Sequence, residues 1–239
     1  MIAATAGALL STSPVGRTQS FGKATHGKDS EFSPNLKVLA QASVKNEVIR
    51  QSLNDTAAEF ERIATLAAKR QSDPAANSLG AITAVVNKLK GAAPDQIYRN
   101  LADRISDMSE AQKNGDFEGV ALAAAEGYRT ARLAQDPAHL AAPVEVYMLE
   151  YTGLKALALA GADSPDWSRL AAINEETSNY WAEISPRVKQ IALRNLTDRI
   201  ISGFKLALAQ ANVTELRFVI KLQFDAANLL KSDLIKQKG

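Results

Sequence analysis

Apolar side chains recur every three or four positions along most of the chain from about residue 43 onward. This spacing places them on one face of an α-helix, with polar residues on the other face. Each apolar stripe is followed by Gly, Asn or Pro, the residues at which helices commonly stop. The pattern predicts four amphipathic helices in the first half of the chain, with stripes over residues 49–67, 79–89, 97–108 and 117–131.

The second half continues the pattern, with one helix of a different kind. Residues 143–160 are apolar nearly all round, which indicates a buried central helix. Ser164-Pro165 and Ser185-Pro186 are typical helix starts, with Ser as the cap and Pro at the first helical position. Asn212 and Glu215 form a capping-box pair that predicts the start of the last helix. The remaining stripes cover residues 167–184, 188–207 and 216–234.

These patterns predict an all-α fold: an up-and-down multi-helix bundle of about eight amphipathic helices in helical hairpins. Strand signals are almost absent, and no repeat of 20–50 residues recurs, which argues against a solenoid. Residues 136–142 form a weak seam between the two halves, but we expect residues 31–239 to form a single all-α helical domain.

Residues 1–30 have the composition of a targeting segment or a disordered tail. A short apolar run at residues 2–10 is followed by a stretch rich in Ser, Thr and Gly, although no Lys or Arg precedes the run. We expect export, with a signal peptide and the periplasm as the leading compartment. Targeting to an organelle, or a cytoplasmic protein with a disordered tail, are the alternatives. No apolar run is long enough for a transmembrane span.

Charge is distributed unevenly along the chain. The formal net charge of +2 divides into +3 for residues 1–28, −7 for residues 29–185 and +6 for residues 186–239. The simplest interpretation is that the basic end offsets the acidic middle within the molecule, and an acidic protein partner is the next. Nucleic acid is not expected as a partner, because the basic residues are interleaved with apolar positions and form no cluster.

The composition excludes several classes of chemistry. The chain has no Cys and only two His, His26 and His139, so cysteine–zinc sites, iron–sulfur clusters and disulfides are excluded. No Glu-x-x-His, Gly-x-Ser-x-Gly, phosphate-binding loop or Gly-x-Gly-x-x-Gly motif occurs. We therefore expect a protein that is not an enzyme; an enzyme that uses Glu150 as acid or base is a weaker alternative.

Glu150 is the candidate site residue, because it is a carboxylate within an otherwise apolar helix. Such a group needs a hydrogen bond, an ion pair or a bound cation. Tyr147 and Tyr151 lie one helical turn apart, one on each side of Glu150 in the sequence, and are its expected partners. Met148 with Tyr151 could also ligate a haem iron. Counting outward from a loop near residue 138 places Glu126 level with Glu150 on the preceding helix.

Aromatic residues are concentrated on the helix over residues 167–184. Trp167 and Trp181 are expected in the core, or alternatively in the wall of a ligand pocket or a protein contact. The leading hypothesis is a soluble, exported, non-catalytic bundle that binds a small ligand or cation, or serves as an accessory subunit of an envelope assembly. The alternative is a helical scaffold or adaptor that binds a protein partner on its outer faces and has no internal site.

Overall fold

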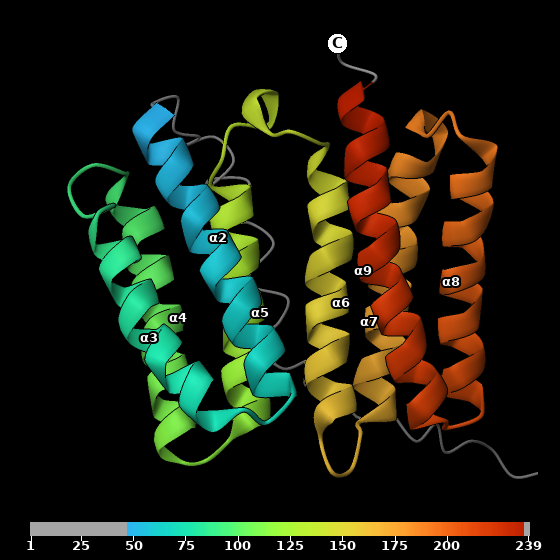
Figure 1. The fold of residues 1–239 in the computed structure, drawn as a ribbon, viewed down its shortest axis with the longest axis horizontal. Helices are drawn as coiled ribbons and strands as arrows, with labels where there is room; N and C mark the ends of the chain where they lie inside the picture. Colours follow the sequence, from blue (N-terminus) through green and yellow to red (C-terminus); the bar gives the residue numbers. More distant parts are fainter. Residues whose placement is uncertain (1–46, 237–239) are drawn as a thin grey trace, which may run out of the picture.

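A computed structural model describes residues 47–236 of the chain. The expected targeting segment or tail at residues 1–30 lies outside this range. The described part holds eight α-helices and two short 3₁₀ turns, with no β-strand, so the predicted all-α fold is confirmed (Figure 1). The elements are α2 (Glu47–Ala68), α3 (Ser72–Asn87), α4 (Asp95–Lys113), α5 (Phe117–Leu133), η2 (Pro137–His139), α6 (Val144–Gly161), α7 (Trp167–Ile184), η3 (Ser185–Arg187), α8 (Ile191–Ala209) and α9 (Val213–Lys236).

The helices run up and down in two groups of four that lie side by side (Figure 1). In the first bundle, α2, α3, α4 and α5 each pack on the next, and α5 closes the ring against α2. In the second bundle, α6 to α9 do the same, and α9 closes on α6. The chain passes from one bundle to the other through residues 134–143, which is where the sequence shows its weak seam. Helix α6 joins the bundles, because it also packs against α2 and α5.

The amphipathic stripes predicted from the sequence are the buried faces of these helices. In α2, for example, Leu53, Phe60 and Ile63 are fully buried at the predicted spacing. Helix α6 is different, as its sequence suggests: 13 of its 18 residues are buried. Because α6 lies between the two bundles, nearly every one of its faces needs an apolar neighbour.

Small residues let other elements approach α6 closely. A Cβ added to Gly153 would lie 3.1 Å from the Phe224 ring of α9. A Cβ added to Gly161 would lie 2.6 Å from the backbone oxygen of Ala68 at the end of α2. Neighbouring elements therefore approach this helix closely at Gly153 on the side of the second bundle and at Gly161 on the side of the first.

Two of the predicted helix starts are wrong, by two residues for α7 and by five for α8. Helix α7 begins at Trp167, where the Asp166 carboxylate accepts a hydrogen bond from the backbone N–H of Arg169 at 3.0 Å. Asp166 caps the helix in place of Ser164, because its carboxylate is the group that reaches an unpaired N–H of the first turn. Ser185-Pro186 opens only the short turn η3, and α8 starts at Ile191.

A tight turn joins the end of α8 to the start of α9. Ala211 has a positive φ of 48°, a conformation that Gly normally supplies after a helix. Asn212 then caps α9, since its side-chain oxygen accepts from the backbone N–H of Glu215 at 3.1 Å. The predicted capping pair is confirmed. Across residues 47–236, no helix has both the length and the hydropathy that a bilayer crossing requires.

Candidate functional site

Two tyrosine–glutamate hydrogen bonds join α5 to α6 in a reciprocal arrangement. The Tyr128 hydroxyl on α5 donates to Glu150 Oε2 on α6 at 2.5 Å. The Tyr151 hydroxyl on α6 donates to Glu126 Oε1 on α5, also at 2.5 Å. The predicted level of Glu126 and Glu150 on neighbouring antiparallel helices is therefore correct. The expected partners were wrong: the phenol that serves Glu150 comes from the facing helix, because Tyr151 is directed to Glu126.

Glu150 also forms an ion pair with the second bundle. Lys231 Nζ on α9 lies 2.5 Å from Glu150 Oε1. The Glu150 side chain is only 3% exposed, and that of Lys231 is 22% exposed. Burial of a carboxylate is costly without such partners. With a phenol on one oxygen and an ammonium on the other, both oxygens of Glu150 are engaged by the protein itself.

Tyr147 contributes its ring to this cluster. The Arg132 guanidinium lies 4.5 Å from the ring centroid, and Lys231 Nζ lies 5.5 Å from it. Cations are attracted to the face of an aromatic ring, so Tyr147 helps to hold both of them in partly buried positions. We call Glu150, Tyr128, Tyr147, Arg132 and Lys231 the Glu150 cluster.

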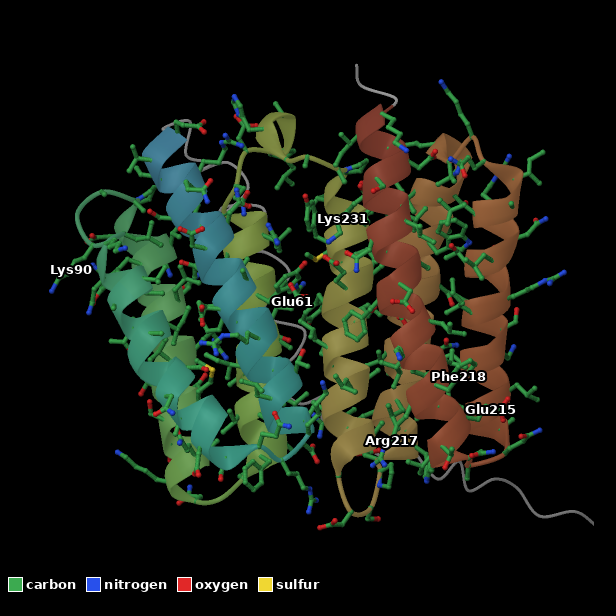
Figure 2. The ribbon with its side chains drawn as sticks, viewed as in Figure 1. Glu61, Lys90, Glu215, Arg217, Phe218 and Lys231 are labelled. Carbon is green, nitrogen blue, oxygen red and sulfur yellow. The ribbon has the colours of Figure 1, made fainter. Side chains whose placement is uncertain are left out.

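Protonation in the cluster follows from burial. Burial, followed by the charge of Glu150, raises the pKa of Tyr128 well above its ordinary value, so the phenol keeps its proton and donates it. Glu61 on α2 faces the same region, and burial together with the charge of Glu150 raises its pKa as well. Figure 2 labels Glu61 and Lys231 where the two bundles meet. Glu61 therefore binds its proton more tightly in the folded protein than an exposed glutamate does.

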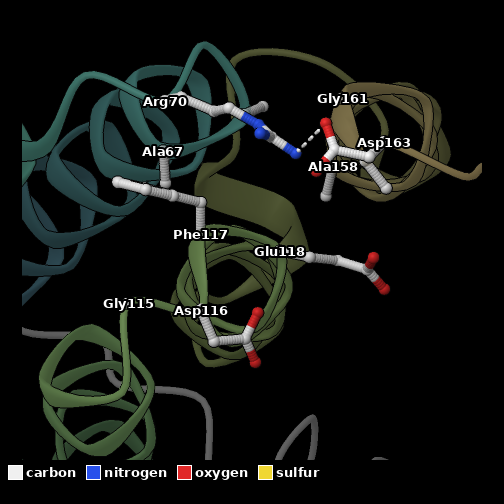
Figure 3. Close-up of a pocket in the computed structure, with 11 residues that line it drawn as sticks. Ala67, Arg70, Gly115, Asp116, Phe117, Glu118, Ala158, Gly161 and Asp163 are labelled. Atoms are coloured by element: carbon white, nitrogen blue, oxygen red, sulfur yellow. Dashed lines mark ion pairs between the residues drawn. The ribbon is translucent and has the colours of Figure 1, made fainter.

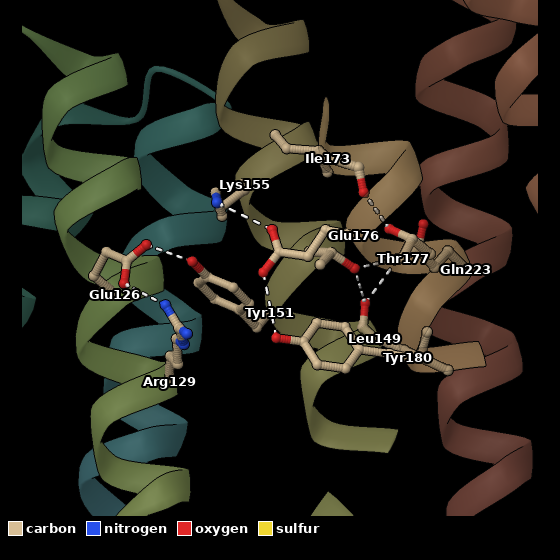
Figure 4. A network of polar contacts seen from close by, with 11 residues as sticks. Glu126, Arg129, Leu149, Tyr151, Lys155, Ile173, Glu176, Thr177, Tyr180 and Gln223 are labelled. Atoms are coloured by element: carbon tan, nitrogen blue, oxygen red, sulfur yellow. Dashed lines mark hydrogen bonds and ion pairs between the residues drawn. The ribbon is translucent and has the colours of Figure 1, made fainter. Parts of the chain in front are cut away.

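A second polar network joins α5, α6 and α7 (Figure 4). It contains the Tyr151–Glu126 hydrogen bond, and the Arg129 guanidinium lies 5.1 Å from the Tyr151 ring centroid. On the α7 side, Glu176 accepts from Lys155 Nζ and from the Tyr180 hydroxyl, both at 3.3 Å. Burial, then the charge of Glu176, raises the pKa of Tyr180 to about 12. Glu126 is therefore paired with Tyr151 across helices, whereas Glu176 pairs with Lys155 across helices and with Tyr180 on its own helix.

The other residues singled out in the sequence lie in the core or pack against it. Met148 is buried in α6, and Trp181 is buried with its indole N–H donating to Asp198 Oδ1 at 2.6 Å. Trp167 is partly buried at the start of the same helix as Trp181. Fourteen positions on a helix correspond to about 21 Å, so the two indoles form no common wall. The structure brings Glu150 and Tyr147 into one cluster and places Tyr151 in the neighbouring network.

Two clefts lie side by side at one end of the molecule, away from Glu150. A cavity of about 370 Å³ is lined by the end of α2, the start of α5 and the end of α6 (Figure 3). Arg70 pairs with Asp163 across it at 2.8 Å, and Glu118 pairs with Arg169 at 3.0 Å. A neighbouring cleft of about 630 Å³ shares the Arg70–Asp163 pair. Within residues 47–236, no three His, Asp or Glu side chains are grouped as metal ligands would be.

An apolar outer face lies along the seam between α8 and α9. Of the seven large hydrophobic residues that are exposed in the described part of the chain, only Val48 lies outside these two helices. Phe218 is 60% exposed, Leu229 51% and Leu206 50%. Leu196 and Leu229 line one shallow groove of about 280 Å³ between the two helices. We call Ala192, Leu196, Leu206, Phe218, Leu222 and Leu229 the α8–α9 seam.

Sequence reasoning missed this surface. These six residues lie within the ranges predicted for α8 and α9, but none of them is among the apolar positions that define the two predicted stripes, of which Ile191 is itself exposed. The sequence did contain a signal: α8 and α9 have more apolar residues than one buried helix face can accommodate, so some of them must be exposed. Comparison of the chain with protein-family models, with curated proteins and with solved structures finds no match to any of them.

Proposed function

We propose that the protein is a non-catalytic helical scaffold that binds a partner protein on the outer face of α8 and α9. The observation that carries this proposal is the exposed α8–α9 seam. Contiguous exposed apolar surface on a folded protein is typical of an interaction site. Four of the seven large exposed hydrophobic residues in the described part of the chain, Leu196, Leu206, Phe218 and Leu229, belong to this seam.

The Glu150 cluster supports the scaffold over an internal ligand site. Each oxygen of Glu150 has a protein partner, Tyr128 or Lys231. A bound cation would have to displace the Lys231 ammonium, and a neutral ligand would have to replace at least one charge-assisted hydrogen bond. Binding of a small ligand or cation at Glu150, Tyr147 and Tyr151 stays a second hypothesis. A ligand found by native mass spectrometry and lost in Glu150→Gln would favour it.

Cross-linking in the source cell tests the scaffold. A photo-reactive residue is placed at position 229 in the seam or, as a control, at exposed Asn77 on α3 in the first bundle. The proposal expects one discrete protein cross-link from position 229 that disappears with Phe218→Ser. Equal cross-linking from both positions, or none from position 229, would refute it.

Export also remains a proposal, because it rests on residues 1–30. Mass determination of the mature N-terminus tests it directly. A chain that has lost about its first 30 residues supports export or organelle targeting. A chain that keeps them supports the cytoplasmic alternative.

A further inference from the structure

The contacts of α8 with α9 define how the seam is arranged. A Cβ added to Gly203 would lie 3.4 Å from a methyl group of Val219, so these two positions face each other. The helices are antiparallel, and counting away from this pair brings Leu206 near Phe218 at one end. The same counting brings Leu196 near Leu229 at the other end, in agreement with the groove that they share. The seam therefore has two apolar layers, 10 or 11 residues apart on each helix, or about 15–17 Å.

This spacing and shape fit a helix. The groove between two packed helices is concave and accepts the ridge of a third helix. An amphipathic helix with apolar residues at positions i, i+4, i+7 and i+11 spans about 16 Å along its axis, which matches the two layers. A bilayer surface offers no ridge to fill a concave groove, so the shape favours a protein partner over a membrane.

The charges beside the seam indicate the sign of that partner. Arg199 is three positions after Leu196, Lys221 three after Phe218, and Lys236 seven after Leu229, so all three cations lie on or next to the apolar face. All three are exposed, and none of them makes an ion pair with another described residue. Asp225 is the one exposed acidic residue of the described chain that lies between Phe218 and Leu229 on this face. In the groove at Leu196 and Leu229, Asp233 also lines the floor, where its carboxylate accepts from the Gln190 amide at 2.6 Å. The seam is thus mainly apolar along its floor and mainly basic along its edges.

Two occupants from the chain itself are disfavoured by the same charges. A second copy that used the same face would bring these cations against their own equivalents. Residues 1–46 carry five basic and two acidic side chains, so they are also basic. Acidic side chains are what the edges of the seam attract.

We propose that the α8–α9 seam binds an acidic amphipathic helix of a partner protein, with its apolar ridge on Leu196, Leu206, Phe218 and Leu229 and its carboxylates toward Arg199, Lys221 and Lys236. This inference rests on the proposed scaffold function and adds the chemistry of the partner. It differs from the simplest sequence interpretation, in which the basic end offsets acidic helices within the molecule. In the described residues, the cations of residues 186–236 form only two ion pairs with the preceding helices, Arg187–Glu145 and Lys231–Glu150.

A displayed peptide library tests both the seam and its charge. Each peptide has 18 residues, with Leu, Ile or Phe at positions i, i+4, i+7 and i+11 and with Glu, Lys, Gln or Ser at every flanking position. The library is selected on the full chain and, in parallel, on the Phe218→Ser/Leu229→Ser double variant. Ile191→Ser, which removes an exposed apolar residue of α8 from outside the seam, is the matched control.

The two proposals fail in different ways in this experiment. The inference expects selected peptides that are lost on the double variant, kept on Ile191→Ser, and enriched about tenfold in Glu over Lys at the flanks. Selection that depends on the seam but shows no preference for Glu would overturn the acidic partner and leave the scaffold standing. No selection that depends on the seam would overturn both. If the full chain binds vesicles with one quarter anionic lipid and the double variant does not, the seam is a membrane-binding surface and the inference is overturned. If the full chain forms dimers in sedimentation and the double variant does not, the seam binds a second copy and the inference is overturned as well.

Discussion

Removal of the cation from the Glu150–Lys231 pair is expected to destabilise the whole molecule. Lys231→Met keeps most of the apolar stem of the side chain and leaves the Glu150 carboxylate, 3% exposed, with only the Tyr128 phenol as its partner. Breaking a fully buried ion pair from one side costs about 3–5 kcal/mol. Because the Lys231 side chain is 22% exposed, the expected loss is at the lower end, about 3 kcal/mol.

A double-mutant cycle measures the pair itself. In Glu150→Gln, the amide oxygen can still accept from Tyr128, while the amide group no longer carries a charge. The Glu150→Gln/Lys231→Met double variant is therefore expected to be about 1–2 kcal/mol more stable than Lys231→Met alone, because no unpaired charge stays buried. The assay is urea unfolding followed by helical circular dichroism at pH 7, with equal slopes required for all variants.

The matched control is Lys221→Met, the same substitution on the same helix at an exposed lysine that forms no ion pair with the described residues. It is expected to stay within about 0.5 kcal/mol of the parent protein. A Lys231→Met variant that is as stable as this control would refute the buried pair. Additive effects of Glu150→Gln and Lys231→Met would show that the two side chains do not interact.

Three further predictions test local packing, a helix end and a titrating group. Gly127→Ala should lower the free energy of unfolding by about 1–2 kcal/mol, because the added Cβ would lie 2.3 Å from the buried Phe60 ring. Gly80→Ala, where the added Cβ meets nothing within 4 Å, should raise it by about 0.5–1 kcal/mol. Both are measured by thermal or urea unfolding, and similar results for the two variants would contradict the packing of α2 on α5. Ala211→Gly should raise stability by about 0.5–1 kcal/mol by relieving the positive φ, and a loss would contradict that backbone conformation. The pKa of Glu61 in the folded protein is raised above 4.5, so ionisation of Glu61 lowers the stability of the fold as the pH rises past 4.5, and the loss is complete above the folded-state pKa. Glu61→Gln should therefore raise the melting temperature at pH 7 and leave it unchanged well below pH 4.5. The opposite pH dependence would exclude this assignment.

The fold could be predicted from the sequence because its helices follow a local rule. The buried stripes of α2 and the capping of α9 by Asn212 depend on residues three or four positions apart, which the sequence shows directly. The start of α7 shows the limit of such rules: both Ser164 and Asp166 are good N-capping residues, and the path of the chain after α6 decides between them. The division into two bundles also depends on which helices α6 packs against.

The site was predictable only in part. The need of Glu150 for partners follows from its apolar neighbours, and its level with Glu126 follows from antiparallel counting. The choice of Tyr128 over Tyr151 depends on side-chain direction across the two helices. Lys231 lies 81 positions away in sequence, and no local pattern connects it to Glu150. The seam was missed because exposure is a property of the assembled molecule.

The central claim is that the α8–α9 seam binds an acidic amphipathic helix. It is tested most directly by the affinity of a peptide selected on the full chain, measured by fluorescence anisotropy for the parent protein, Leu229→Ser and Ile191→Ser. The structure predicts at least about a tenfold loss for Leu229→Ser, little change for Ile191→Ser, and weaker binding as salt is raised. Equal affinities for the two variants, or binding that does not respond to salt, would contradict the claim.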